Sequence, residues 1–378
     1  MRVYTSDADY DDISILPILV NPEGTPNVFY VDTDLAQCWS SKVGTELLVT
    51  TNELGSSNGG WDEEDVAVIT SVDTVTGAIT VHEPLAHYKT TEMQDTRFAT
   101  EVAILHRSTT FEAVEDNVDE PWIGGHFVIK HTLVNQLLSG VAFENFGQQG
   151  RLGRLTLVVA YYSYSSTFSR RLSVAIAFLS NSAIYSFLVF AGRYPIHFHM
   201  AGDHPNSIVS KNLVRNSKQR CIVIRGTDSI LVKENVAYDT VGHCFINENG
   251  VEENIRFFRN LGAKTKRQPE ERRIGDLLES DHRAYTFWFT NANVFVEGNV
   301  AAGAGKLVSF VFVYLPWLAS FFYATSLTNP HSSSLTFQTL EDFGTRHSSR
   351  VLTDRTLNCP SMQTSIRRPA PLAPSETM

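Results

Sequence analysis

The sequence contains few cysteines and no excess of basic residues. The first shortage argues against a disulfide framework, and the second against nucleic-acid binding. Only four cysteines occur in 378 residues, with no C-x-x-C pair, so no disulfide framework is predicted. Acidic residues outnumber basic ones by 41 to 31, giving a formal net charge of −10. Because nucleic-acid binding needs a basic face, nucleic acid is excluded as a partner. The length suffices for two ordinary domains.

The stretch from Arg193 to Gly303 contains a repeat of about 23 residues. The segment V-S-K-N at 209–212 recurs as V-K-E-N at 232–235, and Q-R-C-I at 219–222 recurs as G-H-C-F at 242–245. A fixed period of this length is typical of solenoids, and the runs are too short and too rich in Val, Ile and Phe for helical repeats. The sequence therefore predicts an all-β protein, a right-handed parallel β-helix with one coil per repeat.

The repeat also predicts which side chains stack. Strands of successive coils lie about 4.8 Å apart, and the 23-residue step places position 220 beside both 197 and 243. Side chains alternate between the faces of a strand, so two apolar columns are expected inside: Phe198 with Cys221 and Cys244, and Met200 with Val223 and Ile246. The outer face then carries a polar column of His197, Arg220 and His243, flanked by His199, Ile222 and Phe245. Cys221 and Cys244 come within disulfide range, with a reduced pair as the equal alternative.

Asparagine recurs at the corner that follows a strand, as Asn212, Asn235 and Asn299. Stacked asparagine side chains can hydrogen-bond up and down such a column. We therefore expect a structural ladder with no catalytic role.

Several unusual strings occur in an order that resembles a known family. They are R-Y-P-I-H-F-H-M-A-G-D from Arg193, R-C-I-V-I-R-G-T from Arg220, Y-D-T-V-G-H-C-F from Tyr238 and F-W-F-T-N from Phe287. Together they are similar to the β-helix of the cell migration-inducing hyaluronan-binding proteins, the related cell-surface hyaluronidase and the fibrocystin-like proteins. The resemblance covers about residues 30–154 and 193–303. It implies an extracellular protein, in a family of which some members bind or depolymerise hyaluronan.

The resemblance also divides the chain into parts. It implies a partial eight-glycine-type β domain over 31–116 and the parallel β-helix over 117–154 and 193–303, while Pro17, Pro22 and Pro26 predict a loop-like N-terminus over residues 1–30. The glycine-rich first half of the eight-glycine domain is absent, and Trp39 is the tryptophan expected before its V-G-T-E-L strand. Strands are expected in this domain at residues 43–51, 66–72, 78–81 and 101–107.

Two hydrophobic stretches begin where the family pattern breaks. One is an insertion over residues 155–192, with an uncharged run at 172–191; the other opens the tail, 304–378, with a run at 307–327 before a Ser/Thr/Pro/Arg-rich end predicted to be disordered. Either run is long enough to associate with or span a membrane. A span between two coils would pull neighbouring strands apart, so an inserted excursion, such as translated intron, is favoured over a membrane helix or a packed helical insertion.

The beginning of the chain does not fit an exported protein. Its first residues, M-R-V-Y-T-S-D-A-D-Y, are polar and acidic, with no secretory signal peptide. The resemblance implies export, so we expect that the chain lacks its true beginning, as in an incomplete gene model.

The polar column is the candidate site. An anionic polysaccharide such as hyaluronan would need a local basic strip on this acidic protein, which Arg193, Lys218, Arg220 and Arg225 can supply. We expect Arg193, His197, His199 and Arg220 to bind substrate, with the planar fork of Arg220 on a sugar carboxylate. His243 is the candidate general acid or base, because its reference pKa lies near neutrality.

Cleavage of the polymer would need further groups. Hydrolysis usually uses two carboxylates at a defined separation; among Asp203, Asp239, Glu248 and Glu252, the first two are preferred, with a turn cap as the alternative for Asp239. A lyase would instead use His197 or His243 as a base with help from Arg220.

A metal site is a weaker possibility. The H-x-H pair of His197 and His199, with Asp203 beyond it, is a weak candidate for a divalent cation such as calcium. Two function classes stay open: a hyaluronan-like depolymerase, and a non-catalytic extracellular binding or adhesion module.

Overall fold

The structure of the protein is a computed structural model. The residues that it describes are 2–3, 15–17, 26–50, 64–86, 100–114, 122–149, 158–159, 186–187, 193–272, 284–291, 293–303, 310–311 and 335–336.

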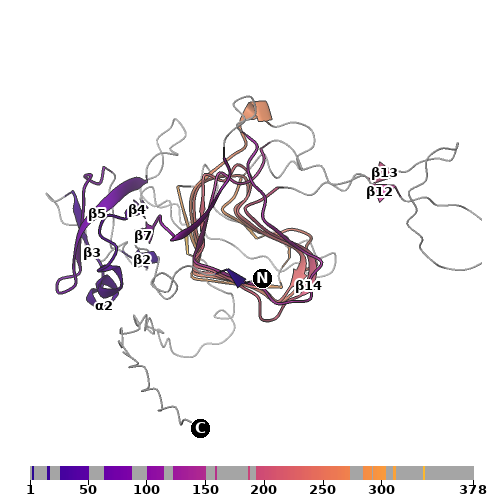
Figure 1. Ribbon diagram of the computed structural model, residues 1–378, viewed down its shortest axis with the longest axis horizontal. Helices are drawn as coiled ribbons and strands as arrows, with labels where there is room; N and C mark the ends of the chain where they lie inside the picture. Colours follow the sequence, from indigo (N-terminus) through magenta and orange to yellow (C-terminus); the bar gives the residue numbers. More distant parts are fainter. Residues whose placement is uncertain are drawn as a thin grey trace, which may run out of the picture.

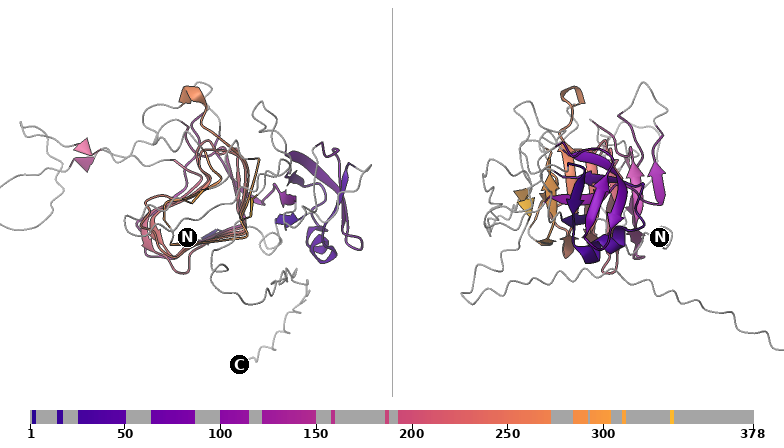
Figure 2. Two further views of the ribbon diagram at one scale, coloured as in Figure 1. Left: turned by 180° about the vertical axis from the view of Figure 1, so that it is seen from behind. Right: turned by 90° about the vertical axis from the view of Figure 1, so that its left-hand side faces the viewer.

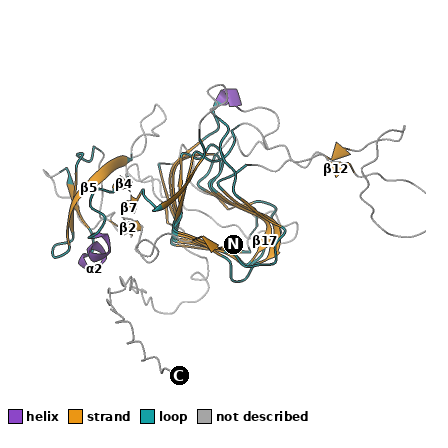
Figure 3. Cartoon of the chain, in the orientation of Figure 1, coloured by secondary structure: helices purple, strands orange, loops and turns teal. Residues whose placement is uncertain are grey.

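Three sheets form the walls of a parallel β-helix, in which each coil contributes a strand to each sheet (Figures 1 and 3). Seen along the solenoid, the coils superpose into a three-sided outline (Figure 1). Neighbouring strands from residue 193 to 303 pair in parallel in all three sheets. The predicted right-handed parallel β-helix is therefore confirmed.

The first sheet contains, in spatial order, β1 (Arg2–Val3), β10 (Leu137–Ser139), β15 (Ile208–Ser210), β18 (Leu231–Lys233), β21 (Ile255–Phe258) and β24 (Val294–Glu297). The second contains β27 (Leu335–Thr336), β25 (Val300–Ala302), β22 (Leu261–Lys266), β19 (Val236–Val241), β16 (Leu213–Arg215), β11 (Val141–Glu144) and β8 (Thr109–Glu112). The third contains β26 (Phe310–Val311), β23 (Phe287–Phe289), β20 (Phe245–Asn247), β17 (Ile222–Asp228), β14 (Ile196–Asp203) and β9 (Val128–Lys130).

The inside of the solenoid is apolar. Phe198, Ile224 and Phe245 are fully buried in one continuous cluster that draws on all three sheets. Burying a side chain of this size contributes roughly 2 kcal/mol. The alternation of short apolar strands along the sequence is thus what closes each coil.

The corner between the first and second sheets is held by the predicted asparagine ladder, which is confirmed and also includes Asn260. The amide of Asn212 donates to Asn235 Oδ1 at 3.0 Å, Asn235 donates to Asn260 Oδ1 at 2.9 Å, and Asn260 donates to Asn299 Oδ1 at 2.8 Å. The same oxygens also accept backbone N–H groups of the neighbouring coil. All four side chains are buried, so the ladder satisfies a corner that water does not reach.

The N-terminal region forms a separate antiparallel sheet with the order β2-β7-β4-β5-β6-β3 (Figure 2). Its strands are β2 (Ile15–Pro17), β7 (Glu101–Ile104), β4 (Glu46–Val49), β5 (Asp65–Asp73), β6 (Ala78–Val81) and β3 (Val28–Tyr30). A short α2 (Thr33–Ala36) and the 3₁₀ turn η1 (Gln37–Trp39) place Trp39 fully buried in this sheet's core. The predicted strands are confirmed, and Trp39 is a core residue of the sheet.

The N-terminal sheet packs on the outer face of the second sheet of the solenoid. Leu48, Ala103 and Leu105 join one apolar cluster with residues of that face, including Leu213 and Leu261. At the edge of this contact, Arg215 makes a two-pronged ion pair with Glu46, at 2.6 and 3.2 Å. The second sheet is therefore covered by protein.

Some element boundaries differ from expectation. The strand β8 pairs in parallel with β11, so the solenoid already includes Thr109–Glu112, which the resemblance assigns to the preceding domain. Strands β1, β2 and β3 also lie in the N-terminus that is expected to be loop-like. The charged stretch after β22 contains a 3₁₀ turn, η2 (Glu270–Arg272).

The predicted insertion lies almost wholly outside the described residues. Its two described strands, β12 (Val158–Val159) and β13 (Ser186–Phe187), pair antiparallel in a sheet of their own. Among the described residues, no helix combines the length and apolarity needed to cross a membrane. The uncharged runs at 172–191 and 307–327 fall mostly outside those residues, and the nature of the insertion and tail stays a prediction.

One predicted register is wrong, and the reason is local. Nine positions separate Ile222 of β17 from Leu231 of β18, but twelve separate Ile196 of β14 from Ile208 of β15. The longer corner makes the step from β14 to β17 26 residues instead of 23, so Ile196 pairs with Ile222. Position 197 consequently lies beside 223, whereas the 23-residue step from β17 to β20 holds.

Candidate functional site

The outer face of the third sheet carries the candidate site. Because residues alternate along a strand, one outward row runs across the strands as Val128, His197, Val223, Ile246 and Trp288. Two positions further along each strand, a second row contains Lys130, His199 and Arg225 in direct register. Glu248 continues this row beyond Arg225, because its N–H bonds to the carbonyl of Ile224 at 2.9 Å. Aromatic and basic groups therefore share the outer face of the third sheet, which is called the outer wall below.

His197 is at the centre of an aromatic cluster and is fully buried. Its ring lies 4.9 Å from the Tyr194 ring and 5.0 Å from the His199 ring, centroid to centroid. His197 Nδ1 and His126 Nε2 are 3.3 Å apart, at hydrogen-bond distance. Within the described chain, His197 Nε2 and His199 Nδ1 are buried with no hydrogen-bond partner. Polar atoms left in this state cost free energy and require an explanation.

Burial and neighbouring cations keep these imidazoles neutral. Burial lowers the pKa of His197 to about 2, with further lowering by His199, His126, Arg220 and Arg225. Burial likewise lowers the pKa of His126 to about 4, helped by the charge of Arg193. The pKa of His199 is also lowered, first by burial and then by Arg225 and Lys130. Neutral imidazoles can accept a proton or a hydrogen bond at ordinary pH.

Arg220 lies under this cluster and is 1% exposed. Its guanidinium stacks over the Tyr194 ring, 4.9 Å from the centroid. The same group donates from Nη1 to Glu248 Oε1 at 2.8 Å, and the other oxygen of Glu248 lies 3.7 Å from Arg225 Nη1. Two arginines of one coil thus share one carboxylate.

His243 belongs to the same wall but is turned toward aromatic partners. Its ring stacks on Trp288 at 4.5 Å and on Tyr285 at 5.6 Å, and its Nδ1 accepts the Tyr285 N–H at 3.2 Å. It is fully buried. Trp288 in turn packs with Tyr194, Val223 and Ile246 in a small cluster on this face.

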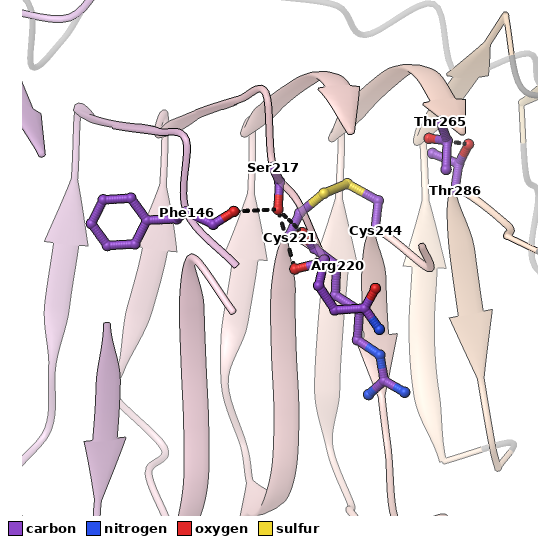
Figure 4. Close-up of a disulfide and its surroundings, with 8 residues drawn as sticks. Phe146, Ser217, Arg220, Cys221, Cys244, Thr265 and Thr286 are labelled. Carbon is purple, nitrogen blue, oxygen red and sulfur yellow. Dashed lines mark hydrogen bonds between the residues drawn. A yellow bond between two sulfur atoms is a disulfide. The ribbon is translucent and has the colours of Figure 1, made fainter. Parts of the chain in front are cut away.

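A disulfide joins the coils directly behind Arg220 and His243. Cys221 and Cys244 are bonded, which decides between the oxidised and reduced alternatives in favour of the bridge (Figure 4). The bridge is fully buried, and the Arg220 side chain extends away from it (Figure 4). Each cysteine directly follows a predicted site residue, so the bridge fixes the backbone from which those two side chains project.

The expected columns need correction. Phe198 stacks with Ile224, and His197 with Val223, whereas Arg220 and His243 lie one coil apart as predicted. Ile222 and Phe245, expected outside, are in the core. Met200, expected inside, is 48% exposed. The longer corner after β14 accounts for the shifted pairing of positions 197 and 198. Ile222 and Phe245 turn inward for another reason: β17 and β20 begin at these residues, and Arg220 lies before β17 in a left-handed conformation, so strand alternation does not extend back to it.

The expectation that the polar column faces solvent is also wrong. His197, Arg220 and His243 are no more than 1% exposed, and His199 is 6% exposed. They do lie on the outer side of the sheet, beneath Tyr194, Tyr285 and Trp288 rather than in the solenoid interior. Their proposed roles stay predictions, and the solvent contact of this wall falls to Lys130, Arg225 and Glu248.

The predicted carboxylates do not join the histidines. Asp239 is on the second sheet in a left-handed conformation, φ 54°, and is ion-paired with Lys264 and Lys266. This supports its alternative role as a turn residue. Asp203 is exposed at the end of β14, beside Asp228 in register. Glu252 is buried and accepts three backbone N–H groups, from Gly226, Asn249 and Gly250, each at 2.9 Å.

The weak metal candidate gains no support. Within the described residues, no group of three or more His, Cys, Asp or Glu side chains is arranged to hold a metal ion. His197 and His199 contact each other by their rings, while Asp203 lies beyond a bulge in β14 that follows His199. Calcium or another cation at these three residues remains an untested prediction.

Reasoning from the sequence misses four contributors to the wall, which are His126, Lys130, Tyr194 and Trp288. Tyr194 and Trp288 lie within the family strings, and the simple signal for Lys130 is V-I-K, a strand that ends on the row of His199. Arg225 is expected in the basic strip and is there, and Arg193 lies near enough to His126 to lower its pKa. Lys218 is buried at a turn, with its N–H bonded to Phe146.

Comparison with known proteins identifies the solenoid. Residues 186–342 match the family described as CEMIP beta-helix. Communication mutant protein F of Dictyostelium discoideum is 27% identical over 73% of this chain and 21% of its own length. Human cell surface hyaluronidase CEMIP2 is 31% identical over 30% of this chain and 10% of its own, and the mouse cell migration-inducing and hyaluronan-binding protein is 30% identical over 33% and 11%.

The chain thus spans a tenth to a fifth of the length of these curated relatives. A solved tailspike of Acinetobacter baumannii bacteriophage AP22, in complex with capsular saccharide, covers 78% of this chain and 52% of its own at 10% identity. Its TM-score of 0.18 is too low to bear on the site. The match over residues 186–342 and the parallel sheets agree with the strings from Arg193 to Asn291: this part of the chain is a parallel β-helix that is similar in sequence to the CEMIP beta-helix.

Proposed function

We propose that the outer face of the third sheet binds an anionic, uronic-acid-containing polysaccharide, with hyaluronan as the first polymer to test. The carrying observation is the row of Lys130, His199 and Arg225, in register on three adjacent strands of an otherwise acidic protein. Adjacent strands are about 4.8 Å apart, so a polymer lying along the solenoid would meet the cations of Lys130 and Arg225 on either side of the buried His199. A local basic row of this kind attracts an anion despite the negative net charge.

The site chemistry fits such a ligand. Guanidinium groups bind carboxylates in a planar, two-pronged manner. His199 Nδ1 and Arg225 Nε lie beside this surface, buried and with no hydrogen-bond partner among the described residues. Trp288, which is partly exposed and packs on the buried Tyr285, supplies flat apolar surface on the same face. Relatives named as hyaluronidases and as a hyaluronan-binding protein support the choice of polymer.

An extracellular or cell-surface location goes with this proposal. Structural disulfides persist in oxidising compartments, and Cys221–Cys244 bridges two coils. Relatives whose names place them at the cell surface agree with that location.

Depolymerisation is the finer proposal. The imidazoles of His197 and His126, with pKa values lowered to about 2 and about 4, are unprotonated but weakly basic, so they accept a hydrogen bond more readily than they take a proton. Among the described residues of this wall the carboxylate is Glu248, held by two arginines, so the two-carboxylate arrangement of hydrolases is not evident. Proton abstraction next to a carboxylate that an arginine neutralises, followed by departure of the glycosidic oxygen, fits the groups better. Without cleavage, the same wall serves as a binding or adhesion module.

The test is retardation of the full chain by hyaluronan in a gel at low and at physiological salt. Arg225→Ala should weaken retention about tenfold, and Arg256→Ala, which removes an exposed arginine from β21 on another sheet, should not. Arg220→Ala should weaken it too, because Arg225 would then be the remaining arginine partner of Glu248 and less available to the polymer. Equal retention of the Arg225 and Arg256 variants would remove this face from consideration. Cleavage is read from polymer size, and a new ultraviolet-absorbing double bond would identify elimination.

A further inference from the structure

Glu248 is held differently from the other buried carboxylate of its coil. Glu252 is completely buried and fixed by three backbone N–H groups at 2.9 Å. Glu248 is partly exposed, with a side chain at 13%, and is held by side chains alone. It accepts one hydrogen bond from Arg220 at 2.8 Å and lies 3.7 Å from Arg225, beyond hydrogen-bond distance.

The two arginines differ in how they are anchored. Arg220 is 1% exposed, stacked on Tyr194 and fixed next to the disulfide. The side chain of Arg225 is 27% exposed, and its buried Nε has no hydrogen-bond partner within the described chain. One firmly placed and one accessible guanidinium therefore flank a single loosely held carboxylate on the outer row.

We propose that Glu248 is an internal substitute for a ligand carboxylate: it occupies the Arg220–Arg225 site in the free protein and is displaced when a carboxylate of the polymer binds there. This inference rests on the proposed function of the wall. It makes Glu248 a residue that limits affinity and selects for carboxylate ligands, although an acidic residue on an anion-binding face would ordinarily be counted as neutral or damaging.

Displacement exchanges the carboxylate of Glu248 for a carboxylate of the ligand. A ligand carboxylate can offer both oxygens to the Arg225 fork, a geometry that Glu248 does not achieve. The displaced Glu248 already borders solvent, so its release regains hydration. Because one negative charge replaces another, Arg220 keeps a counter-ion throughout, and no uncompensated buried charge arises.

The first arm compares Glu248→Gln with Glu253→Gln in the hyaluronan retardation assay. Both substitutions remove one negative charge from the same coil, but Glu253 is exposed and bonds through its backbone N–H to Asp228. In Glu248→Gln, the side-chain amide oxygen can still accept from Arg220. This variant should bind the polymer about two- to fivefold more tightly than the parent, the gain expected from removing one partly exposed competing charge. Unchanged or weaker retention, or an equal gain in Glu253→Gln, would overturn the proposal.

The second arm does not depend on the polymer. In Glu248→Ala the Arg220–Arg225 site should accept acetate, so sodium acetate should raise the melting temperature above its value in sodium chloride of equal ionic strength. The parent and Glu253→Ala should show no such difference. A melting temperature equally insensitive to acetate in all three proteins would contradict a carboxylate site.

The two arms separate the two proposals. Acetate rescue with no retention of the parent protein by hyaluronan would keep the carboxylate site and remove the proposed polymer. Retention of the parent that depends on Arg225, with neither acetate rescue nor a gain in Glu248→Gln, would keep the proposed function and remove the displacement of Glu248.

Discussion

Two groups of buried polar side chains in this solenoid are satisfied to very different degrees. In the asparagine ladder, the amides of Asn212, Asn235 and Asn260 each bond to a neighbouring asparagine and to a backbone carbonyl. On the outer wall, His197 Nε2, His199 Nδ1 and Arg225 Nε are buried among the described residues with no hydrogen-bond partner. The ladder shows that this solenoid can satisfy its buried polar groups. The outer face nevertheless retains polar atoms that do not contribute to stability. We interpret the ladder as structural and the wall as the ligand-binding region.

Breaking the ladder should have the largest effect on stability. Asn235→Ala removes the acceptor of the Asn212 N–H and side-chain amide, and also the donor to Val209 O. Leaving several buried groups unsatisfied should lower the free energy of unfolding by about 4 kcal/mol. Urea denaturation of the parent and the variant measures this. A loss below about 1 kcal/mol would mean that water or a shifted neighbour can replace the ladder at this corner.

Removing the bridge behind the wall should have the next largest effect. The pair Cys221→Ala and Cys244→Ala opens a link between residues 23 positions apart, and should lower the free energy of unfolding by about 3 kcal/mol. The same variant should lose polymer retention, since Arg220 and His243 directly precede the two freed positions. Full retention in a destabilised variant would show that packing on Tyr194 and Trp288 alone positions those side chains.

The wall should make stability sensitive to acid. His197 stays neutral in the folded protein down to about pH 2, whereas an unfolded histidine takes up a proton near its ordinary value of about 6.5. Protons then bind the unfolded state preferentially, so the free energy of unfolding falls as pH decreases below about 6.5. The slope from one such proton is about 1.4 kcal/mol per pH unit.

His197→Phe should flatten this slope and cost less than about 1 kcal/mol at pH 7, because a ring of similar size replaces a group with a partnerless nitrogen. Denaturation curves between pH 4 and 7 for the parent and the variant measure both effects. A neutral-pH loss as large as that of Asn235→Ala would contradict the distinction between ladder and wall.

The ion pair between the N-terminal sheet and the solenoid should matter least. Arg215 and Glu46 are 25% and 35% exposed, and pairs in water contribute about 0.2 to 1 kcal/mol. Glu46→Gln should therefore change the free energy of unfolding by less than about 1 kcal/mol, with little effect on polymer retention. A larger loss would mean that this pair, rather than the apolar cluster around Leu48, holds the two parts together.

Repetition makes the coils predictable, and one departure from the 23-residue step misleads the prediction of the site. The strings around Val209 and Val232, or Cys221 and Cys244, carry the 23-residue step because their corners have equal length. The recurrence of Asn212, Asn235 and Asn299 predicts the ladder. Asn260 is missed because it lies 25 residues, not 23, after Asn235. The three additional residues between Ile196 and Ile208, one of them in the bulge of β14, shift His197 from Arg220 to Val223. Exposure is not predictable from strand alternation, because Tyr194 and Tyr285, which lie before their strands, pack against His197 and His243.

The most direct test of the central claim is lysine footprinting by acetylation and mass spectrometry, with and without hyaluronan, on the full chain. Lys130 lies on the outer row with His199 and Arg225, and Lys233 on the first sheet serves as an internal control. Binding along the third sheet predicts that the polymer slows acetylation of Lys130 severalfold and leaves Lys233 unchanged. Equal labelling of Lys130 with and without a polymer that the protein retains would place the ligand elsewhere and contradict the account.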